Sequence, residues 1–360
     1  MSDFHERPFD EGTLAKLEIF ELYASEWLPV FLATPRPRRE EIHIFDFFSG
    51  PGLDLRGAIG SPLRILRTLR RCIALRHSGW PEVRITVHFF DIDPDKIATL
   101  RSNIASRDME LQGVDIDLRP LAFNQALEEN QGILREQSFA KLLLIDQCGV
   151  DQVTEEIFGN LVAYPTTDFL FFISSSTLHR FRDHPAIKLK IVRPTDYYHV
   201  HRMALEYYRE LLSDRSRYYL APFSIKKGAN IYGLIFGSAH PLGMDKFLQV
   251  AWKADRLNGE ADYDINRDNL QIDQMMLPSR EFLPHKIGAF EQELDKNLRN
   301  GSYRNEAEII RLCFEHGVKR QHAAPVLQKL KTEGIIELDF RVPDIKRIDS
   351  PRSIRLSERP

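Results

Sequence analysis

Short apolar runs alternate with amphipathic stretches through the first half of the chain. The first run, Ile42–Phe48, is largely apolar and stops at Ser49-Gly50-Pro51-Gly52, as a buried parallel strand entering a tight turn does. Further strands are predicted at Val83–Phe90, Val114–Leu118, Lys141–Ile145 and Asp168–Ile173, and helices between them at Pro62–His77, Pro94–Ser106, Gln125–Glu136 and Val153–Val162. This alternation predicts an α/β fold with a doubly wound parallel sheet and right-handed crossovers.

The pattern changes after Ser174. A helix is predicted at Thr195–Leu212, followed by two strand-like runs, Tyr218–Ile225 and Ile231–Phe236. The residues that join these runs, Lys226-Lys227-Gly228-Ala229-Asn230, indicate a hairpin at the edge of the sheet. Because a methyltransferase-type sheet ends in an antiparallel hairpin and a nicotinamide-binding sheet normally stays parallel, the pattern favours a Rossmann-like methyltransferase sheet.

Helical patterns flank this domain on both sides. Leu14–Leu32 repeats apolar residues every three or four positions and is expected to be a cover helix. Near the other end, three helices and a short strand suggest a winged-helix-like module, with predicted bounds Ile287–Leu298, Glu306–Phe314, Gln321–Thr332 and Ile335–Phe340. The expected division is a cover helix in 1–40, an α/β domain in 41–257, a linker in 258–284, the module in 285–345 and a flexible tail in 346–360.

Composition and charge indicate the class and the location of the protein rather than the reaction that it carries out. The 360 residues carry a formal charge of −3, so a basic surface for nucleic acid would have to be local. The three cysteines, Cys72, Cys148 and Cys313, are too widely spaced for a disulfide framework or a paired zinc-ligand pattern. The first residues are polar and acidic, unlike a signal peptide, and no apolar run is long enough for a membrane span. A cytoplasmic protein is expected.

The turn after the first strand is the leading candidate for cofactor binding. Glycines at the carboxyl end of a strand let the backbone pass close to a ligand, and open α/β sheets bind ligands at that edge. A plain tight turn is the alternative, and the Walker lysine is absent. The residues expected to hold the cofactor here are Asp46, Phe48, Ser49, Gly50 and Gly52.

The next two strands end in further candidates. Asp91 follows the second strand, where a carboxylate can accept hydrogen bonds from both hydroxyls of a ribose, and Ile92 adjoins it. Asp93 precedes Pro94 and is expected to be a helix N-cap. Phe123 and Asn124 follow the third strand, where an adenine would be flanked; Asn124 could equally be a helix cap.

An acid, an amide and a thiol follow the fourth strand. Asp146, Gln147 and Cys148 are the candidate catalytic residues, because a carboxylate and nearby carbonyls could orient a nucleophilic nitrogen for in-line methyl transfer. Cys148 could instead be a small core residue.

Hydroxyl and basic residues follow the fifth strand and occupy the hairpin. They could hold an anionic substrate, although a solvated helix start would explain the serines as well; the expected substrate-binding residues are Ser174, Ser175, His179, Arg180, Lys226 and Lys227. Arg64, Arg67 and Arg71 share one helical face and could grip phosphates or form a solvated face. The histidines lack metal-ligand spacing, so no metal is expected.

These segments together resemble the three-Cys-motif partner family, which is methyltransferase-like. The resemblance covers roughly Leu17–Ile265, and its anchors are Phe45–Gly52, Gly60–Pro62, Phe90–Pro94, Leu144–Gly149, Phe171–Ser176 and Tyr232–Pro241. Many members have Asp-Pro-(Phe or Tyr)-Gly after the fourth strand, whereas this chain has Gln147 and Cys148 in place of the proline and the aromatic residue. The resemblance implies a three-cysteine partner protein in settings related to mobile elements. The lost aromatic residue counts against stacking on a flipped base.

Two functions remain open from the sequence. The first is an S-adenosylmethionine-dependent methyltransferase acting on nucleic acid or protein. The second is a binding module with the same fold that lacks turnover and works with its three-cysteine partner. A nicotinamide-dependent oxidoreductase does not explain the closing hairpin.

Overall fold

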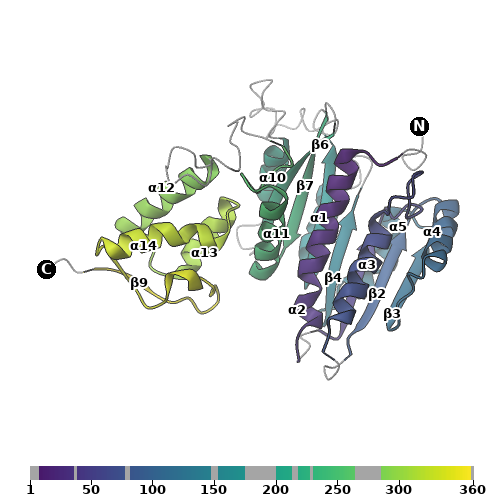
Figure 1. Cartoon of the computed structure of the whole chain (residues 1–360), viewed down its shortest axis with the longest axis horizontal. Coiled ribbons are helices and arrows are strands. Elements are labelled where there is room, and N and C mark those ends of the chain that lie inside the picture. Colours follow the sequence, from purple (N-terminus) through teal and green to yellow (C-terminus); the bar gives the residue numbers. More distant parts are fainter. Residues whose placement is uncertain are drawn as a thin grey trace. The chain divides into compact units, whose positions relative to one another are not determined.

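The computed structural model describes residues 8–35, 39–77, 82–146, 153–174, 200–212, 218–227, 230–263 and 285–357. The chain forms two compact units, residues 1–250 and residues 251–360 (Figure 1). The first unit contains the large sheet, and the second is mainly helical.

Seven strands form the sheet of the first unit. They are β1 (Glu41–Asp46), β2 (Arg84–Phe90), β3 (Val114–Arg119), β4 (Phe139–Ile145), β5 (Thr167–Ser174), β6 (Tyr219–Lys227) and β7 (Asn230–Ser238). Their order is β3-β2-β1-β4-β5-β7-β6. The first five pair in parallel, and β7 is antiparallel to both β5 and β6. This order, with its closing hairpin, confirms the doubly wound Rossmann-like methyltransferase sheet.

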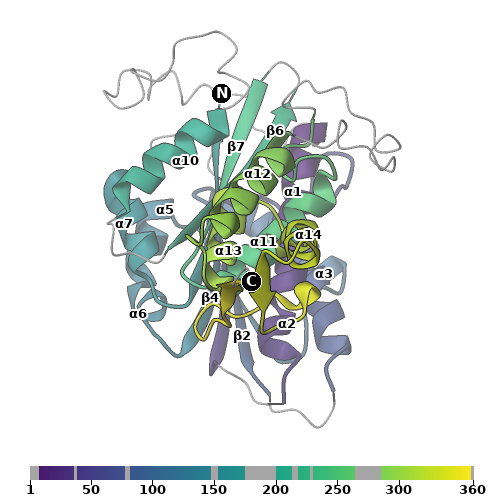
Figure 2. The same ribbon diagram turned by 90° about the vertical axis from the view of Figure 1, so that its left-hand side faces the viewer.

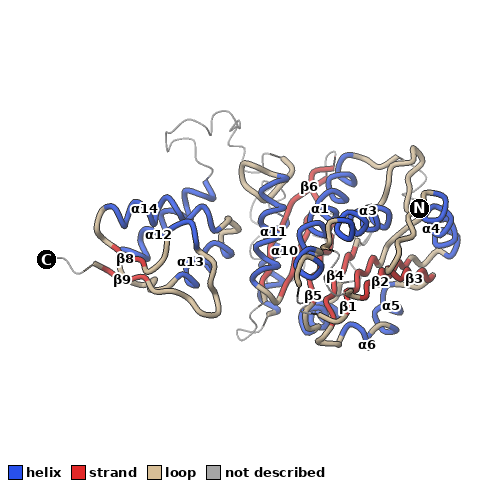
Figure 3. The backbone as a smooth tube through the Cα atoms, turned by 60° about the horizontal axis from the view of Figure 1, so that its bottom comes forward, coloured by secondary structure: helices blue, strands red, loops and turns tan. Residues whose placement is uncertain are grey.

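Helices cover both faces of the sheet, and Figure 3 shows the strands running between two helical layers. One layer consists of α1 (Glu11–Trp27), α2 (Pro29–Leu32), α3 (Ser61–Ala74), α4 (Pro94–Ser106) and α11 (Pro241–Ala254). The other consists of α5 (Phe123–Glu129), α6 (Gln131–Leu134), α7 (Glu155–Ala163) and α10 (Val200–Leu211), as Figure 2 shows from the side. The second layer packs on buried sheet residues such as Phe45, Phe47 and Phe171.

The cover helix is shorter than predicted because Pro29 interrupts it. Proline has no N–H to donate, so α1 ends at Trp27 and the short α2 begins at Pro29. Two buried contacts fix α1 against the rest of the unit. The Tyr23 hydroxyl donates to Asp168 Oδ2 on β5 at 2.6 Å, and Glu21 accepts from Arg64 and Arg67 on α3 at 2.7–3.1 Å.

The arginine face of α3 is therefore an anchor for α1. Arg71 also lies 3.7 Å from the Glu21 carboxylate, so all three arginines of the predicted face surround one acid. The sequence offered a phosphate grip or a solvated face for these arginines, and the contacts show a third role, an ion-pair anchor between two helices.

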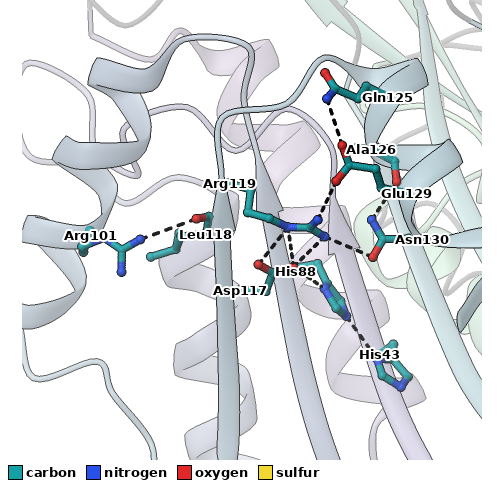
Figure 4. A network of polar contacts seen from close by, with 10 residues as sticks. All are labelled: His43, His88, Arg101, Asp117, Leu118, Arg119, Gln125, Ala126, Glu129 and Asn130. Atoms are coloured by element: carbon teal, nitrogen blue, oxygen red, sulfur yellow. Dashed lines mark hydrogen bonds and ion pairs between the residues drawn. The ribbon is translucent and has the colours of Figure 1, made fainter.

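A row of polar side chains crosses β1, β2 and β3 on the face of the sheet that α5 covers (Figure 4). His43 Nδ1 lies 3.1 Å from His88 Nε2, and His88 Nδ1 lies 3.0 Å from Asp117 Oδ2. Arg119 then joins Asp117 to Glu129 and Asn130 near the end of α5. Burial, followed by the neighbouring positive charges, lowers the pKa of His43 to about 3, so it is neutral in the folded protein.

The second unit has three longer helices and a two-stranded pair. Its elements after the α11 end are α12 (His285–Arg299), α13 (Glu306–Glu315), η5 (Arg320–Ala323), α14 (Ala324–Thr332), β8 (Ile336–Leu338), η6 (Val342–Asp344) and β9 (Ile354–Leu356). The winged-helix resemblance stays a prediction. Residues 258–263 of the expected linker belong to this unit, where Asp255 accepts from the N–H groups of Leu257, Asn258, Glu260 and Ala261.

The expected flexible tail is folded over much of its length. β9 pairs antiparallel with β8, and a buried ion pair anchors the segment before it. Glu306, which has no exposed surface, accepts from Arg352 Nε at 2.9 Å and Nη2 at 2.7 Å, and from the backbone N–H groups of Lys346 and Arg352. The charged residues near the end of the chain suggested that this segment is exposed to solvent. Arg352 is instead held against Glu306, because the buried Glu306 carboxylate needs hydrogen-bond donors.

Removing Arg352 is expected to destabilise the second unit. Arg352→Ala leaves the Glu306 carboxylate buried without its strongest donors, at a cost of about 2–4 kcal/mol. Urea unfolding measures this loss. The exposed Arg347→Ala is the control and is expected to change stability by less than about 0.5 kcal/mol. Equal effects of the two variants would contradict an anchoring role for the pair.

Candidate functional site

Three carboxylates meet at the carboxyl edge of the sheet. Asp46 at the end of β1 stands opposite Phe89 of β2 and Leu144 of β4, and both partner strands run two residues further to an acid. Asp91 and Asp146 therefore flank Asp46. Burial raises the pKa of Asp46, and the charges of Asp146 and Asp91 add to that rise.

Asp46 is the most buried of the three. It is 1 % exposed; its Oδ1 accepts from the Phe48 N–H at 3.2 Å, while its Oδ2 is buried without a hydrogen-bond partner. Burial raises the pKa of Asp46 to about 7, against the lowering effect of the Ser61 hydroxyl and the Phe48 N–H. A buried acceptor atom with unused capacity is a candidate ligand contact.

The glycine turn is tied firmly to the neighbouring strand. The Ser49 N–H and hydroxyl both donate to the Phe90 carbonyl, at 2.9 and 3.0 Å. Gly50 and Gly52 have φ of 58° and 81°, which glycine adopts without strain. A Cβ on Gly52 would lie 2.6 Å from Leu100 Cδ1, so α4 packs directly against the turn. Close helix packing alone thus accounts for the second glycine.

Asp91 shapes the turn from the next strand. Its Oδ2 accepts from the Gly50 N–H at 3.1 Å and its Oδ1 from the Asp93 N–H at 3.0 Å. Each oxygen keeps one lone pair for a ligand hydroxyl. Ile92, by contrast, is 75 % exposed. Asp93 is the N-cap of α4, with its carboxylate accepting from the Asp95 N–H.

Aromatic rings lie beside the turn. Phe123, at the start of α5, packs edge-on to Phe47 with ring centres 5.2 Å apart and against the half-buried Phe48 at 5.6 Å. Phe123 is itself buried, whereas Asn124 is exposed. Ala122 is the N-cap of α5, so the alternative of Asn124 as a helix cap was wrong.

Lys16 is a site residue that the sequence did not reveal. It lies on α1, and its ammonium forms an ion pair with Asp146 Oδ2 and sits 5.0 Å from the centre of the Phe172 ring. Both members of the pair are about one-fifth exposed. The partners are 130 positions apart in the chain, and only the lysine's place on a predicted cover helix hinted at it.

The expected substrate residues are only partly placed. Ser174 ends β5 and pairs with Tyr232 of β7, which also pairs with Ile225 of β6. Lys226 follows Ile225 and is exposed, and Lys227 ends β6, so Ser174 and both lysines reach the same edge of the sheet as the three acids. Gln147, Cys148, Ser175, His179 and Arg180 lie outside the described residues.

Among the described residues, no group of three or more histidine, cysteine, aspartate or glutamate side chains is placed to hold a metal ion. No helix within the same ranges has the length and apolar character needed to cross a membrane.

No protein-family model matches the chain, and no curated protein matches its sequence. Several solved structures are similar. Trm1 from Pyrococcus horikoshii, in complex with S-adenosyl-L-methionine, is 13 % identical with a TM-score of 0.39, over 98 % of this chain and 92 % of its own. An rRNA methylase from Streptococcus thermophilus is 11 % identical with a TM-score of 0.32, over 61 % of this chain and 92 % of its own.

A third similar structure is a putative O-methyltransferase from Klebsiella pneumoniae, 12 % identical with a TM-score of 0.33, over 64 % of this chain and 90 % of its own. All three scores are below 0.5. They add nothing to what the sheet order and the site geometry establish.

Gly52→Ala is expected to destabilise the first unit more than Gly113→Ala. Both glycines have similar positive φ, 81° and 78°, but only the Gly52 Cβ would meet a neighbour within 4 Å. Both variants therefore carry a similar backbone strain. The difference between their free energies of unfolding measures the clash with Leu100 and is expected to be about 1–3 kcal/mol. Urea unfolding of the two variants measures it. Equal losses would show that α4 can move away from the turn.

Asp46→Asn is expected to stabilise the protein at pH 8 and to flatten its stability profile. An unfolded aspartate has a pKa of about 3.9, whereas burial raises the pKa of Asp46 to about 7. The folded state thus binds the extra proton between these values, and stability falls as the pH rises from about 4 to about 7. Unfolding at pH 5 and pH 8 measures the profile, with Asp93→Asn as the control. An unchanged slope in Asp46→Asn would contradict the raised pKa.

Proposed function

We propose that this chain binds S-adenosylmethionine at the carboxyl edge of its sheet and transfers the methyl group to an acceptor nitrogen. The observation that supports the proposal most is the meeting of Asp46, Asp91 and Asp146 around the glycine turn, with Asp46 Oδ2 buried and unpartnered. S-adenosylmethionine carries a sulfonium and an ammonium group besides its carboxylate. Three carboxylates opposed by one lysine suit a ligand of net positive charge.

Each expected cofactor residue then has a physical task. The free lone pairs of Asp91 accept hydrogen bonds from the ribose hydroxyls. Ile92 covers one face of the adenine, and Phe48 and Phe123 supply apolar surface beside it. Gly50 lets the backbone approach the ligand, Gly52 keeps the turn packed against α4, and the unpartnered Asp46 oxygen faces the cationic end of the ligand.

Asp146 is assigned to the acceptor. When bound, S-adenosylmethionine supplies an electrophilic methyl group on sulfur. The Asp146 carboxylate accepts a hydrogen bond from the acceptor N–H and so fixes the direction of the nitrogen lone pair. Holding the two reactants in line is the main contribution that a protein makes to such a transfer.

Nucleic acid is the proposed acceptor, and the proposed partner is a three-cysteine protein, as in the family that the sequence resembles. Ser174, Lys226 and Lys227 lie on the same sheet edge as Asp146, and the lysines add positive charge for a polyanion. The helical second unit is the proposed docking element for the nucleic acid or the partner.

A second candidate is a cofactor-binding partner protein without turnover. The ion pair between Lys16 and Asp146 favours it, because the carboxylate assigned to the acceptor is already engaged. Both candidates bind S-adenosylmethionine, and they differ only in transfer. Calorimetry therefore tests the shared part, and methyl transfer separates the two.

Ile92→Ala is expected to weaken S-adenosylmethionine binding about 5- to 10-fold while leaving the stability of the protein unchanged. Because Ile92 is 75 % exposed, its truncation removes ligand contact without opening the core. Isothermal titration calorimetry measures the affinity. Leu75→Ala, at an 85 % exposed apolar residue after α3, is the matched control and should bind like the unmodified protein. No heat of binding in the unmodified protein would refute both candidate functions.

A further inference from the structure

The position of Lys16 is determined by contacts remote from its own side chain. One and two turns after it on α1, Glu21 is held by Arg64 and Arg67 of α3, and Tyr23 donates to the buried Asp168 of β5. These contacts fix the helix in rotation and along its axis. Lys16 is consequently presented to the end of β4 by a rigid element, as expected for a residue with a positional task.

The ammonium has two contacts at that edge. It pairs with Asp146 Oδ2, and it lies 5.0 Å from the centre of the buried Phe172 ring of β5. A lysine held between a carboxylate and an aromatic face keeps its charge in one place. Because Asp146 is four-fifths buried, this ion pair is screened less than one on the open surface.

The charges around Asp146 make a nearby cation important. Asp46 ends β1 and Asp91 directly follows β2, so both lie at the same sheet edge as Asp146. The Lys16 ammonium on α1 places an opposite charge beside Asp146.

We propose that Lys16 is a positioning residue for methyl transfer, holding the Asp146 carboxylate in the orientation in which it accepts a hydrogen bond from the acceptor N–H. The inference rests on the proposed function. It differs from the second candidate, in which the same ion pair simply closes the site. Lys16 binds one oxygen of the carboxylate, and the other oxygen is left for the acceptor.

A structural role alone makes a different prediction. If Lys16 only attached α1 to β4, replacing it would lower stability without changing the kcat of transfer by the folded protein. Lys246 of α11 provides the matched control, because it forms a 2.7 Å ion pair with Glu26, which lies on α1 like Lys16. The Lys246 side chain is 26 % exposed, against 19 % for Lys16. Lys246→Met thus removes an ion pair of α1 that lies away from the three acids.

The test compares Lys16→Met, Lys16→Arg and Lys246→Met in the full chain. Transfer of labelled methyl groups from S-adenosylmethionine to bulk RNA, duplex DNA and total cell protein is measured at neutral pH, together with calorimetric binding of S-adenosylmethionine. Lys16→Met is expected to bind within about twofold of the unmodified protein and to lose about 10- to 100-fold in kcat. Lys16→Arg should restore most of the rate, and Lys246→Met should change none of these values.

The outcomes separate this inference from the proposed function. Transfer by the unmodified protein with an unchanged kcat in Lys16→Met overturns the role of Lys16 and leaves the methyltransferase intact. Binding of S-adenosylmethionine without transfer to any of the three acceptors overturns the positioning role and supports the partner without turnover. A rate loss in Lys16→Met that Lys16→Arg fails to restore also overturns it, because the second variant keeps the charge.

Discussion

The place of β1 in the middle of the parallel strands is the constraint on which the site depends. β1 pairs with β2 on one side and with β4 on the other, and the register puts the ends of all three strands at one level. Parallel strands point their carboxyl ends to the same edge of a sheet, so the residues that follow them must meet there. The glycine turn, Asp91 and Asp146 are neighbours for this reason, although they are far apart in the chain.

Placing three carboxylates together costs free energy through the repulsion of their charges, and the surroundings reduce this cost to a different degree at each acid. Asp91 accepts hydrogen bonds from two backbone N–H groups, and these bonds also hold the turn in place. Asp146 has the Lys16 ammonium beside it. Asp46 accepts a hydrogen bond from the Phe48 N–H, but burial outweighs this contact and raises the pKa of Asp46 to about 7, so near neutral pH part of the population carries a proton instead of the charge. The three acids differ in chemistry because their surroundings differ, and a cationic ligand would change that balance in favour of ionisation.

The helix α1 connects this edge to the opposite part of the unit. Its Tyr23 reaches the buried Asp168 near the start of β5, while Lys16 reaches the end of β4. Glu21, between them, draws together the arginines of α3, the helix that begins shortly after the glycine turn. A single cover helix thus touches both ends of the sheet and the helix next to the site, which gives the cover layer a part in the geometry of the acids.

The sequence by itself determined the strands, the alternation with helices and the closing hairpin, because buried parallel strands and amphipathic helices have local periods that survive in one dimension. It also proposed Asp46, Asp91 and Asp146 as site residues, since Asp46 lies within an apolar run and the other two acids directly follow one. It could not find Lys16, the pairing of Glu21 with the α3 arginines or the Arg352 anchor of the last strand, and it misjudged the helix break at Pro29 and the cap of α5. Ion pairs between residues 43 to 130 positions apart leave no periodic signal. Which charges meet, and which carboxylate stays buried without a partner, was decided only by the tertiary structure, because burial and proximity are properties of packed elements rather than of the segments that form them.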